Sequence, residues 1–248
     1  MALSKIPLGI AKQLDFLALL PDAHDPAFPE RAVGLLILLD QAPRHLCTKQ
    51  NERSRNSFFN PLALDYALAL RKLPHGVCIH EFPRWEKLGY TYEHFNAISN
   101  LLTAPFAHSE DLAIHETHLL PEVQARRILT EQLYNTLDVQ HAREAAAGTS
   151  IAASSNTLEF ACLFREWIPE GADFAQTVFW WCRVKEAHTP IIRAFGQYPY
   201  RNRAVGRSST PEEVVFLGQT GNFGVSVDEE AAGRIRDDVE RGVWTPLV

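Results

Sequence analysis

The stretch His188–Glu213, HTPIIRAFGQYPYRNRAVGRSSTPEE, carries the signals that decide how the later part of the chain folds. Its apolar start is typical of a helix, and Gly196 and Gly206 then interrupt the helical pattern. Thr210 and Glu213 have the spacing of a capping box, and a proline follows Thr210 where the first helical turn would begin. The stretch therefore predicts a helix, an irregular turn and a new helix.

The irregular turn is rich in arginine and aromatic side chains. The arginines are Arg193, Arg201, Arg203 and Arg207, and the aromatic residues among them are Phe195, Tyr198 and Tyr200. Ordered irregular backbone with many hydrogen-bond donors is a common place for a binding site. An equally open interpretation is that these arginines tie helices together or cap their carbonyl groups.

Composition limits the class of protein. The chain has 248 residues, of which 46% are hydrophobic, so it can bury a sizeable core and form one domain. Its formal net charge of −6 argues against nucleic acid or an anionic membrane as the main partner. The arginine-rich turn is then better suited to a small anion, a carboxylate or internal ion pairs.

Cysteine spacing and hydropathy indicate the compartment. The four cysteines lack any C-x-x-C spacing, which predicts reduced, mostly buried thiols and argues against a disulfide framework or a zinc site built on them. The N-terminal residues do not have the order of a secretion signal, and apolar runs such as residues 33–39 are too short to span a bilayer. We expect a cytoplasmic protein without a membrane segment.

Hydrophobic periodicity predicts an all-α chain of about nine or ten helices, with few or no strands, as one domain over residues 1–248. The expected helices cover residues 2–20, 30–46, 60–73, 92–102, 121–147, 157–167, 174–193 and 228–241, with others starting at His108 or Ser109 and after Thr210. The polar residues 47–59 and the Pro/Gly-containing residues 74–90 are expected to be connections. Pro190 predicts a kink or break near His188.

Asp40 and Arg44 are polar residues at the end of an otherwise apolar helix. They are four positions apart and can therefore pair on one helix face, with Gln41 beside them. A pair in such a place costs desolvation unless further groups complete its hydrogen bonds. The Asp40–Arg44 pair either holds the helix against its neighbours or lines and orients a pocket.

His108 begins a second polar block that is followed by two further histidines, His115 and His118. His108, Asp111 and His115 share a helix face by their spacing, which is one way to hold a metal. Because the local sequence offers only two histidines and one carboxylate there, we expect no metal site. His108 is interpreted either as an acid–base or substrate-contacting residue or as an ordinary interhelix histidine.

Three separated blocks carry a family resemblance. LLILLDQAPR (35–44), PFAHSEDL (105–112) and residues 188–213 resemble, in the same order, signature segments of the domain-of-unknown-function 924 family. In the third block the matching residues are His188, Ile191, Ile192, Phe195, Gly196, Pro199, Arg201, Asn202, Gly206, Arg207, Thr210 and Glu213. Gln197 and Tyr200 depart from the bacterial pattern, so the chain resembles a divergent, fungal-type member.

The resemblance covers roughly residues 30–217 and leaves residues 218–248 as a C-terminal extension. It implies a tetratricopeptide-like array of helices that forms one compact domain. It does not imply a reaction, because the function of that family is not established.

If the three blocks converge, they form a polar site inside an apolar helical shell, as small-molecule pockets usually do. The candidate catalytic residues are His108, Arg44, Asp40, His188 and Arg201. The candidate substrate contacts are Gln41, Glu110, Tyr200, Asn202, Arg207, Phe106 and Trp180.

Two functions of different classes are consistent with this pattern. The first is a cofactor-independent lyase, isomerase or cyclase, such as a pericyclic cyclase, acting on a largely apolar small molecule in specialised metabolism. In it Arg201 or Arg44 would bind a carboxylate or carbonyl, while His108 or His188 would move a proton. The second is a module that binds a peptide in a helical groove. A closed site favours the enzyme, and an open face with exposed arginines favours the binding module.

Overall fold

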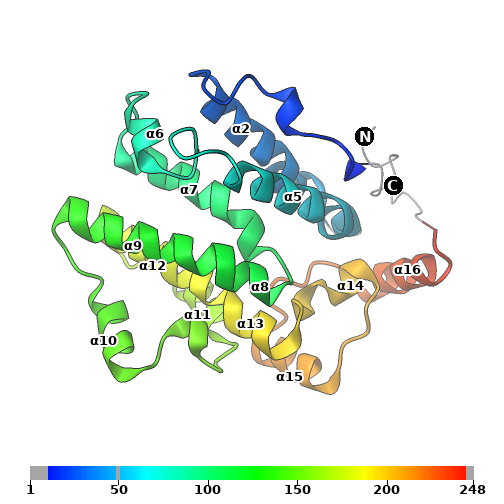
Figure 1. The fold of residues 1–248 in the computed structure, drawn as a ribbon. Coiled ribbons are helices and arrows are strands. Elements are labelled where there is room, and N and C mark those ends of the chain that lie inside the picture. The colour runs from blue at the N-terminus through cyan, green and yellow to red at the C-terminus, as the bar shows by residue number, and fades with distance from the viewer. Residues whose placement is uncertain (1–10, 49–50, 244–248) are drawn as a thin grey trace. The chain divides into compact units, whose positions relative to one another are not determined.

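A computed structural model describes residues 11–48 and 51–243 of the chain (Figure 1). Every regular element in these residues is a helix, which confirms the all-α prediction. No helix in the described part of the chain combines the length and apolarity needed to cross a bilayer. The chain divides into two compact units.

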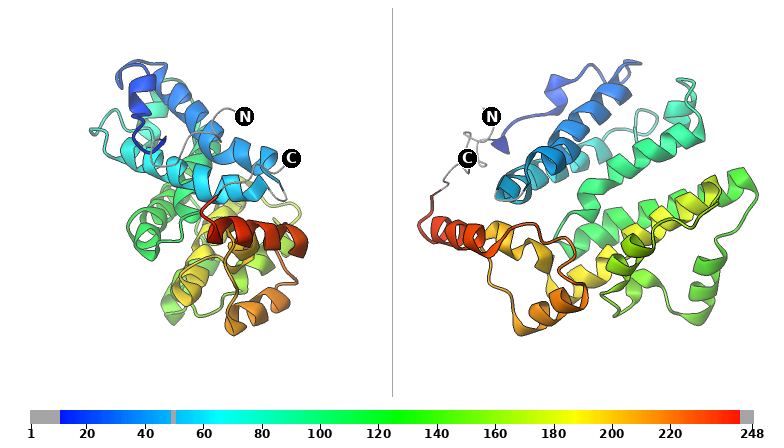
Figure 2. Two further views of the ribbon diagram at one scale, coloured as in Figure 1. Left: turned by 90° about the vertical axis from the view of Figure 1, so that its right-hand side faces the viewer. Right: turned by 180° about the vertical axis from the view of Figure 1, so that it is seen from behind.

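The first unit comprises residues 1–108, 201–208 and 226–248. Its helices are α2 (Phe28–Leu36), α3 (Ala42–Leu46), α4 (Glu52–Ser54), α5 (Asn60–Arg71), α6 (Phe82–Glu86), α7 (Tyr92–Ala107), α14 (Asn202–Val205) and α16 (Glu229–Glu240), with the 3-10 turn η2 (Leu17–Leu19) and the π-helical turns η3 (Ile37–Gln41) and η5 (Arg55–Phe59). Helices α2, α5 and α7 pack against one another and bury a core that includes Leu36, Leu62, Tyr66 and Phe106. Views from two further sides show α14 beside α16 (Figure 2).

The second unit comprises residues 109–200 and 209–225. Its helices are α8 (Leu112–Ile114), α9 (Leu120–Tyr134), α10 (Val139–Ala147), α11 (Glu159–Glu166), α12 (Phe174–Glu186), α13 (His188–Phe195) and α15 (Pro211–Gln219), with the π-helical turn η6 (His115–Leu119) and the 3-10 turn η7 (Ile151–Ala153). Helix α9 lies along α12 (Figure 1). The short turn η8 (Pro199–Arg201) runs across the boundary between the two units.

The three π-helical turns in the described residues are each followed by a proline in the same position. The turns Ile37–Gln41, Arg55–Phe59 and His115–Leu119 precede Pro43, Pro61 and Pro121, each with one residue between. Proline has no N–H, and in an α-helix its ring collides with the carbonyl four residues earlier. A wider turn relieves that collision, and in the first case Ala42 N–H bonds to Ile37 O, five residues back. The prolines thus account for the bulges, and the first bulge contains Asp40.

The helix expected over residues 2–20 is wrong from residue 12 onward, and residues 1–10 lie outside the described residues. From residue 12 the chain is irregular apart from η2. The Asp15 carboxylate accepts the backbone N–H groups of Leu17 at 3.0 Å and Ala18 at 3.3 Å. Such local side-chain bonds offer the backbone an alternative to a continuous helix.

The expected connection over residues 47–59 is also wrong, because the chain is helical from Glu52 onward. Two of its charged residues, Glu52 and Arg53, are buried and form ion pairs: Glu52 with Arg55 at 3.0 Å, and Arg53 with Asp238 at 3.4 Å. The Arg53–Asp238 pair, which no local pattern predicts, therefore holds a segment whose polarity suggested a loop. Within 74–90, α6 adds a short helix whose Trp85 is buried.

Three further predictions of helix boundaries differ from the structure. Helix α7 continues through Pro105 to Ala107, with the proline close to the helix end. The single helix expected over 121–147 is divided, because Asn135 adopts a left-handed conformation with φ 47° and Asp138 caps α10. The helix expected to start at His108 or Ser109 starts instead at Leu112.

Other local predictions are confirmed. The helix over 174–193 breaks at Ala187, immediately before His188. Thr210 and Glu213 form the complete capping box of α15. The four cysteines are free thiols, and three of them are buried.

Candidate functional site

Asp40 is the centre of a polar cluster in the first unit. It lies in the π-helical turn that follows α2, and its side chain is only 1% exposed. Its Oδ1 accepts hydrogen bonds from Nη2 of Arg44 at 3.1 Å and from Nδ1 of His108 at 2.9 Å. Its Oδ2 accepts from the amide of Gln41. Helix α3 thus supplies Arg44, and the C-terminal end of α7 supplies His108.

The cluster shifts the pKa values of its two titratable members in a defined way. Burial alone would raise the pKa of Asp40, but His108 and Arg44 outweigh it and hold the pKa well below its usual range. Burial, together with the positive charge of Arg44, lowers the pKa of His108 to about 3 in spite of the Asp40 carboxylate. At neutral pH the site therefore contains a carboxylate, a guanidinium and a neutral imidazole.

Counting hydrogen-bond donors indicates which imidazole nitrogen carries the proton. The Nη2 atom of Arg44 has two N–H bonds, and Asp40 Oδ1 and Asn60 Oδ1 lie at 3.1 Å from it as acceptors. Arg44 Nη2 also lies 2.5 Å from His108 Nδ1, but both of its hydrogens already have acceptors. The consistent assignment is that His108 Nδ1–H donates to Asp40. Its Nε2 then carries a lone pair.

Two polar atoms of the cluster are left for a ligand. His108 Nε2 has no hydrogen-bond partner among the described residues, and the side chain is 20% exposed. Arg44 bonds only through Nη2 to the described residues, and its side chain is 21% exposed. A lone-pair nitrogen and an unused cationic donor therefore lie on neighbouring residues.

Arg201 contacts this cluster through the backbone carbonyl of His108. Its Nη1 donates to the carbonyl oxygen of His108 at 2.8 Å, and the residue is 5% exposed. Asp40, Arg44, His108 and Arg201 thus converge as expected. That these residues are catalytic stays a prediction.

Two further candidate residues of the first unit, Asn202 and Phe106, are close in sequence to Arg201 and His108. Asn202 begins α14 directly after Arg201, and its carbonyl accepts the backbone N–H of Arg207 at 2.9 Å. Phe106 is fully buried in α7, with the guanidinium carbon of Arg71 5.2 Å from its ring centroid. The described contacts of Phe106 are those of a core residue.

His188 and Trp180 belong to the second unit and have structural surroundings there. Nδ1 of His188 bonds to the Val184 carbonyl at 2.8 Å, one turn back in the chain, and its ring centroid lies 4.2 Å from that of Phe160. Trp180 is part of the aromatic core of the same unit.

Glu110 and Tyr200 also lie in the second unit. Glu110 accepts the backbone N–H of Tyr198 at 2.9 Å, which fixes the start of the irregular turn. Tyr200 stacks on Tyr198 with ring centroids 5.2 Å apart and an interplanar angle of 30°. These contacts order the turn. A role in binding substrate stays a prediction for both.

His115 and Asp111, considered above as metal ligands, have other partners. Both ring nitrogens of His115 have neighbours within hydrogen-bond distance, Thr189 Oγ1 at 3.2 Å and the Ser109 carbonyl at 3.0 Å. Asp111 caps α8 by accepting the N–H of Ala113 at 2.9 Å. Both residues therefore contribute to local structure.

Asn60 is the member of the cluster that sequence reasoning missed. Its carbonyl oxygen accepts from Arg44, and its position follows from the second π-helical turn, which ends at Phe59. The only sequence signal was the Asn-Pro pair at residues 60–61, which we associated with the start of a helix.

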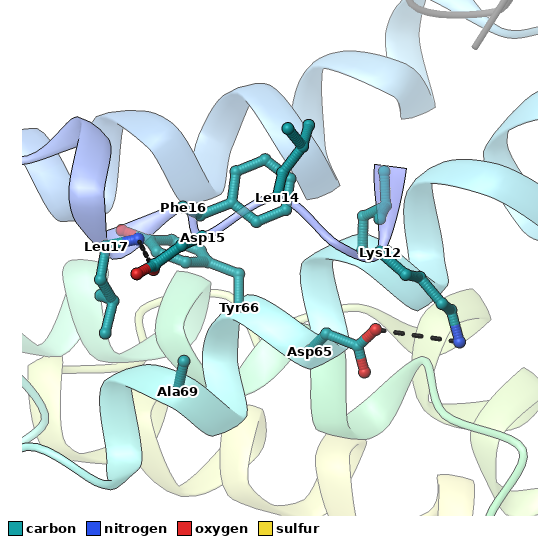
Figure 3. A pocket seen from close by; sticks show the side chains of 9 residues that line it. Lys12, Leu14, Asp15, Phe16, Leu17, Asp65, Tyr66 and Ala69 are labelled. Atoms are coloured by element: carbon teal, nitrogen blue, oxygen red, sulfur yellow. Dashed lines mark hydrogen bonds and ion pairs between the residues drawn. The ribbon is translucent and has the colours of Figure 1, made fainter. Parts of the chain in front are cut away.

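A separate pocket lies between residues 12–17 and α5 (Figure 3). Lys12 and Asp65 point toward one another across its rim, with their charged atoms 3.8 Å apart. Phe16 packs edge-on against Tyr66, with ring centroids 5.9 Å apart. Because Lys12 pairs with Asp65 and Asp15 accepts backbone N–H groups, this pocket offers few polar atoms to a ligand, and the Asp40 cluster is the stronger candidate site.

The three sequence blocks all lie within a single family match. A family model described as a bacterial protein of unknown function, DUF924, matches residues 18–221. The chain belongs to this family. The DUF924 match is somewhat longer than the expected 30–217 and includes the Asp40, Arg44, His108 and Arg201 cluster. No curated protein and no solved structure matches the chain, so the tetratricopeptide-like arrangement stays a prediction.

Proposed function

We propose that this chain is an enzyme that moves a proton on a small molecule at Nε2 of His108. The observation that carries the proposal is the hydrogen bond from His108 Nδ1 to the buried carboxylate of Asp40, at 2.9 Å. A carboxylate at Nδ1 fixes the orientation and tautomer of an imidazole and directs the lone pair of its other nitrogen outward. General acid–base groups require such positioning.

The charges around His108 indicate what kind of substrate fits. Two arginines, Arg44 and Arg201, contact this cluster, and Arg44 is accessible through donors that the described residues do not use. A carboxylate or a polarised carbonyl would complete those donors. An anionic group at Arg44 would also oppose the charge that lowers the pKa of His108, which would make the imidazole a stronger base in the complex.

The reaction class that this arrangement supports is a lyase or isomerase reaction without a cofactor. In it, Nε2 removes a proton next to a carboxylate or carbonyl, and Arg44 stabilises the negative charge that develops on oxygen. The imidazolium then returns the proton to another carbon of the substrate in an isomerisation, or the electron pair expels a leaving group that takes up the proton in a lyase reaction. The largely apolar character of the substrate remains an expectation from the aromatic content of the sequence. The burial of Arg201, at 5% exposed, favours an enclosed role for this arginine over display on an open peptide-binding face.

The proposal is tested by incubating the purified protein with a small-molecule extract of a host strain that lacks it. We expect mass spectrometry to show a compound consumed and a product formed, and the His108→Ala variant to lose most of this conversion. His94→Gln is the matched control, because His94 is an exposed histidine on the same helix, α7.

Two results would contradict the proposal. One is conversion by His108→Ala at the rate of the unmodified protein. The other is an unchanged metabolite profile combined with a protein partner that is captured by the unmodified chain and lost from Arg201→Ala, with both variants folded by circular dichroism. The second result would assign the chain to the peptide-binding class.

A further inference from the structure

The connection between α5 and α6 concentrates side chains that bind metals. It reads PHGVCIHE over residues 74–81 and belongs entirely to the first unit. Its potential ligands are His75, Cys78, His80 and Glu81. None of them belongs to the Asp40 cluster, so the inference does not depend on the proposed function.

The ligand atoms of three of these residues are already close together. One atom each from Cys78, His80 and Glu81 lies within 4.8 Å of the others. His75 extends the group, because its Nδ1 lies 3.0 Å from Oε1 of Glu81. Bonds of about 2.0–2.3 Å in a tetrahedron place two ligands of one zinc ion roughly 3.2–3.8 Å apart. The ligand atoms of Cys78, His80 and Glu81 are thus within about 1 Å of the spacing of a zinc site, and side-chain rotations would close the remaining gap and bring His75 to the ion.

The backbone that carries the ligands is held in place by its neighbours. Val77, Cys78 and Ile79 are buried, and Trp85 donates its indole N–H to the Ile79 carbonyl at 2.7 Å. Gly76 has φ 90°, a conformation that glycine adopts without strain, and this turn separates His75 from Cys78. A fixed backbone lowers the entropy cost of ordering the ligands around an ion.

We propose that Cys78, His80 and Glu81 bind one Zn²⁺ ion, with His75 as the fourth ligand. A thiolate, two imidazoles and a carboxylate are a donor set that suits zinc, whereas magnesium and calcium prefer oxygen ligands alone. Cys78 Sγ now donates to the carbonyls of Leu73 at 3.0 Å and Pro74 at 3.1 Å. On binding, the S–H bond breaks, a sulfur–zinc bond forms and the proton leaves to solvent.

The expectation of no metal rested on the missing C-x-x-C spacing and on the weak histidine pattern around His115. The spacing at 75–81 is H-x-x-C-x-H-E, which contains a single cysteine and so escaped a search based on cysteine pairs. Only the folded turn shows that the ligand atoms of Cys78, His80 and Glu81 lie within 4.8 Å of one another.

The test is a titration of the metal-free full chain with Co²⁺, which replaces zinc and gives a thiolate-to-cobalt absorption band when cysteine is a ligand. We expect saturation at one equivalent, displacement of Co²⁺ by Zn²⁺, and loss of the band in Cys78→Ser. Cys162→Ser is the matched control, because Cys162 is an exposed free thiol outside the cluster, and it should keep the band.

The remaining ligands are tested by affinity. His80→Gln and Glu81→Gln should each weaken binding by at least about tenfold, since even the loss of an outer hydrogen-bond partner costs 10–100-fold. His75→Gln should do the same, whereas His24→Gln should not. His24 is a fair control because it is an exposed histidine whose Nδ1 lies 2.9 Å from the Asp22 carboxylate, as His75 lies beside Glu81.

The absence of a band at one equivalent, or a band that survives in Cys78→Ser, would overturn the proposal. Affinities of His80→Gln and Glu81→Gln within about twofold of the unmodified chain would overturn it as well. An unchanged affinity in His75→Gln would remove the fourth ligand. If Cys78→Ser does not fold, Glu81→Gln decides the question, because that side chain is 32% exposed and its replacement leaves the core intact.

Discussion

Asp40 Oδ1 lies 2.9 Å from Nδ1 of His108, although the two residues are 68 positions apart in the chain. The contact links the bulged end of one helix to the C-terminal end of another. It leaves the outer nitrogen of an imidazole accessible beside a guanidinium.

Replacing Arg44 with methionine is expected to raise the pKa of His108 from about 3 toward its ordinary value, because the guanidinium charge disfavours the imidazolium ion. Nitrogen chemical shifts of the imidazole, followed by NMR across a pH series, report the pKa. The same spectra should show the proton on Nδ1 at neutral pH. Arg31→Met on α2 is the control and should leave the His108 pKa unchanged. An unaltered pKa in Arg44→Met would contradict the electrostatic account.

His108 is also expected to make the protein sensitive to mild acid. Between pH 6.5 and about 3 the unfolded chain binds a proton at this histidine that the folded chain does not. The free energy of unfolding therefore falls as the pH falls through this window. The depressed pKa of Asp40 acts at lower pH, because the stability that its carboxylate contributes is present above its ordinary value of 3.8 and is lost below it.

Urea unfolding at pH 7 and pH 4 measures this effect. The drop in the free energy of unfolding between the two pH values should be smaller in His108→Gln by roughly 2–3 kcal/mol, since each unit of pKa difference is worth about 1.4 kcal/mol. The comparison uses the drop rather than the absolute stability, because the substitution also removes hydrogen bonds at neutral pH. Equal drops in the two proteins would show that His108 titrates normally in the folded chain.

Gly206 offers a test of the packing that holds the Arg201 segment. It has φ 75°, and an added Cβ would lie 3.0 Å from Val239 Cγ2 and 3.4 Å from the Ile235 carbonyl. Gly206→Ala should therefore destabilise the protein by about 1–3 kcal/mol, through strain and close contact with α16. Gly34→Ala in α2 is the opposite case, because an added Cβ there meets nothing within 4 Å, and it should stabilise the helix by about 0.5–1 kcal/mol. Thermal unfolding of both variants checks the difference in sign.

The comparison between sequence and structure shows which interactions a local pattern can predict. The Asp40–Arg44 pair was predictable, because a spacing of four places both side chains on one helix face. The contact with His108 was expected only because three sequence blocks resembled one family, since no local rule joins residues so far apart. Asn60 was missed for the same reason, because its partner Arg44 is 16 positions away and its side chain was assigned to a helix start.

The wrong helix boundaries have a related cause. Residues 52–59 contain enough polar side chains to suggest a loop, but Arg53 finds its partner in Asp238, near the other end of the chain. The π-helical turns were not predicted, because proline was taken to begin or end a helix. In this chain a helix passes through Pro43 by widening the turn before it, and Asp40 lies in that widened turn. Tertiary contacts therefore determine where these helices begin and end.

The last prediction separates positioning from proton transfer once a substrate has been identified in the extract. His108→Ala should lower turnover by about 10²–10⁴-fold, as expected for the loss of a general base. Asp40→Asn should also lower turnover, because an amide at this place no longer requires a proton on Nδ1 and permits the tautomer in which Nε2 carries the hydrogen. Arg44→Met should raise KM, because the guanidinium binds the carboxylate or carbonyl of the substrate, and should also lower turnover, because Arg44 stabilises the charge that develops on oxygen. His94→Gln should change neither constant. If His108→Ala stays folded and keeps its turnover, while substitution of buried aromatic residues abolishes it, the reaction depends on shape rather than on proton transfer, and the role assigned to Nε2 is wrong.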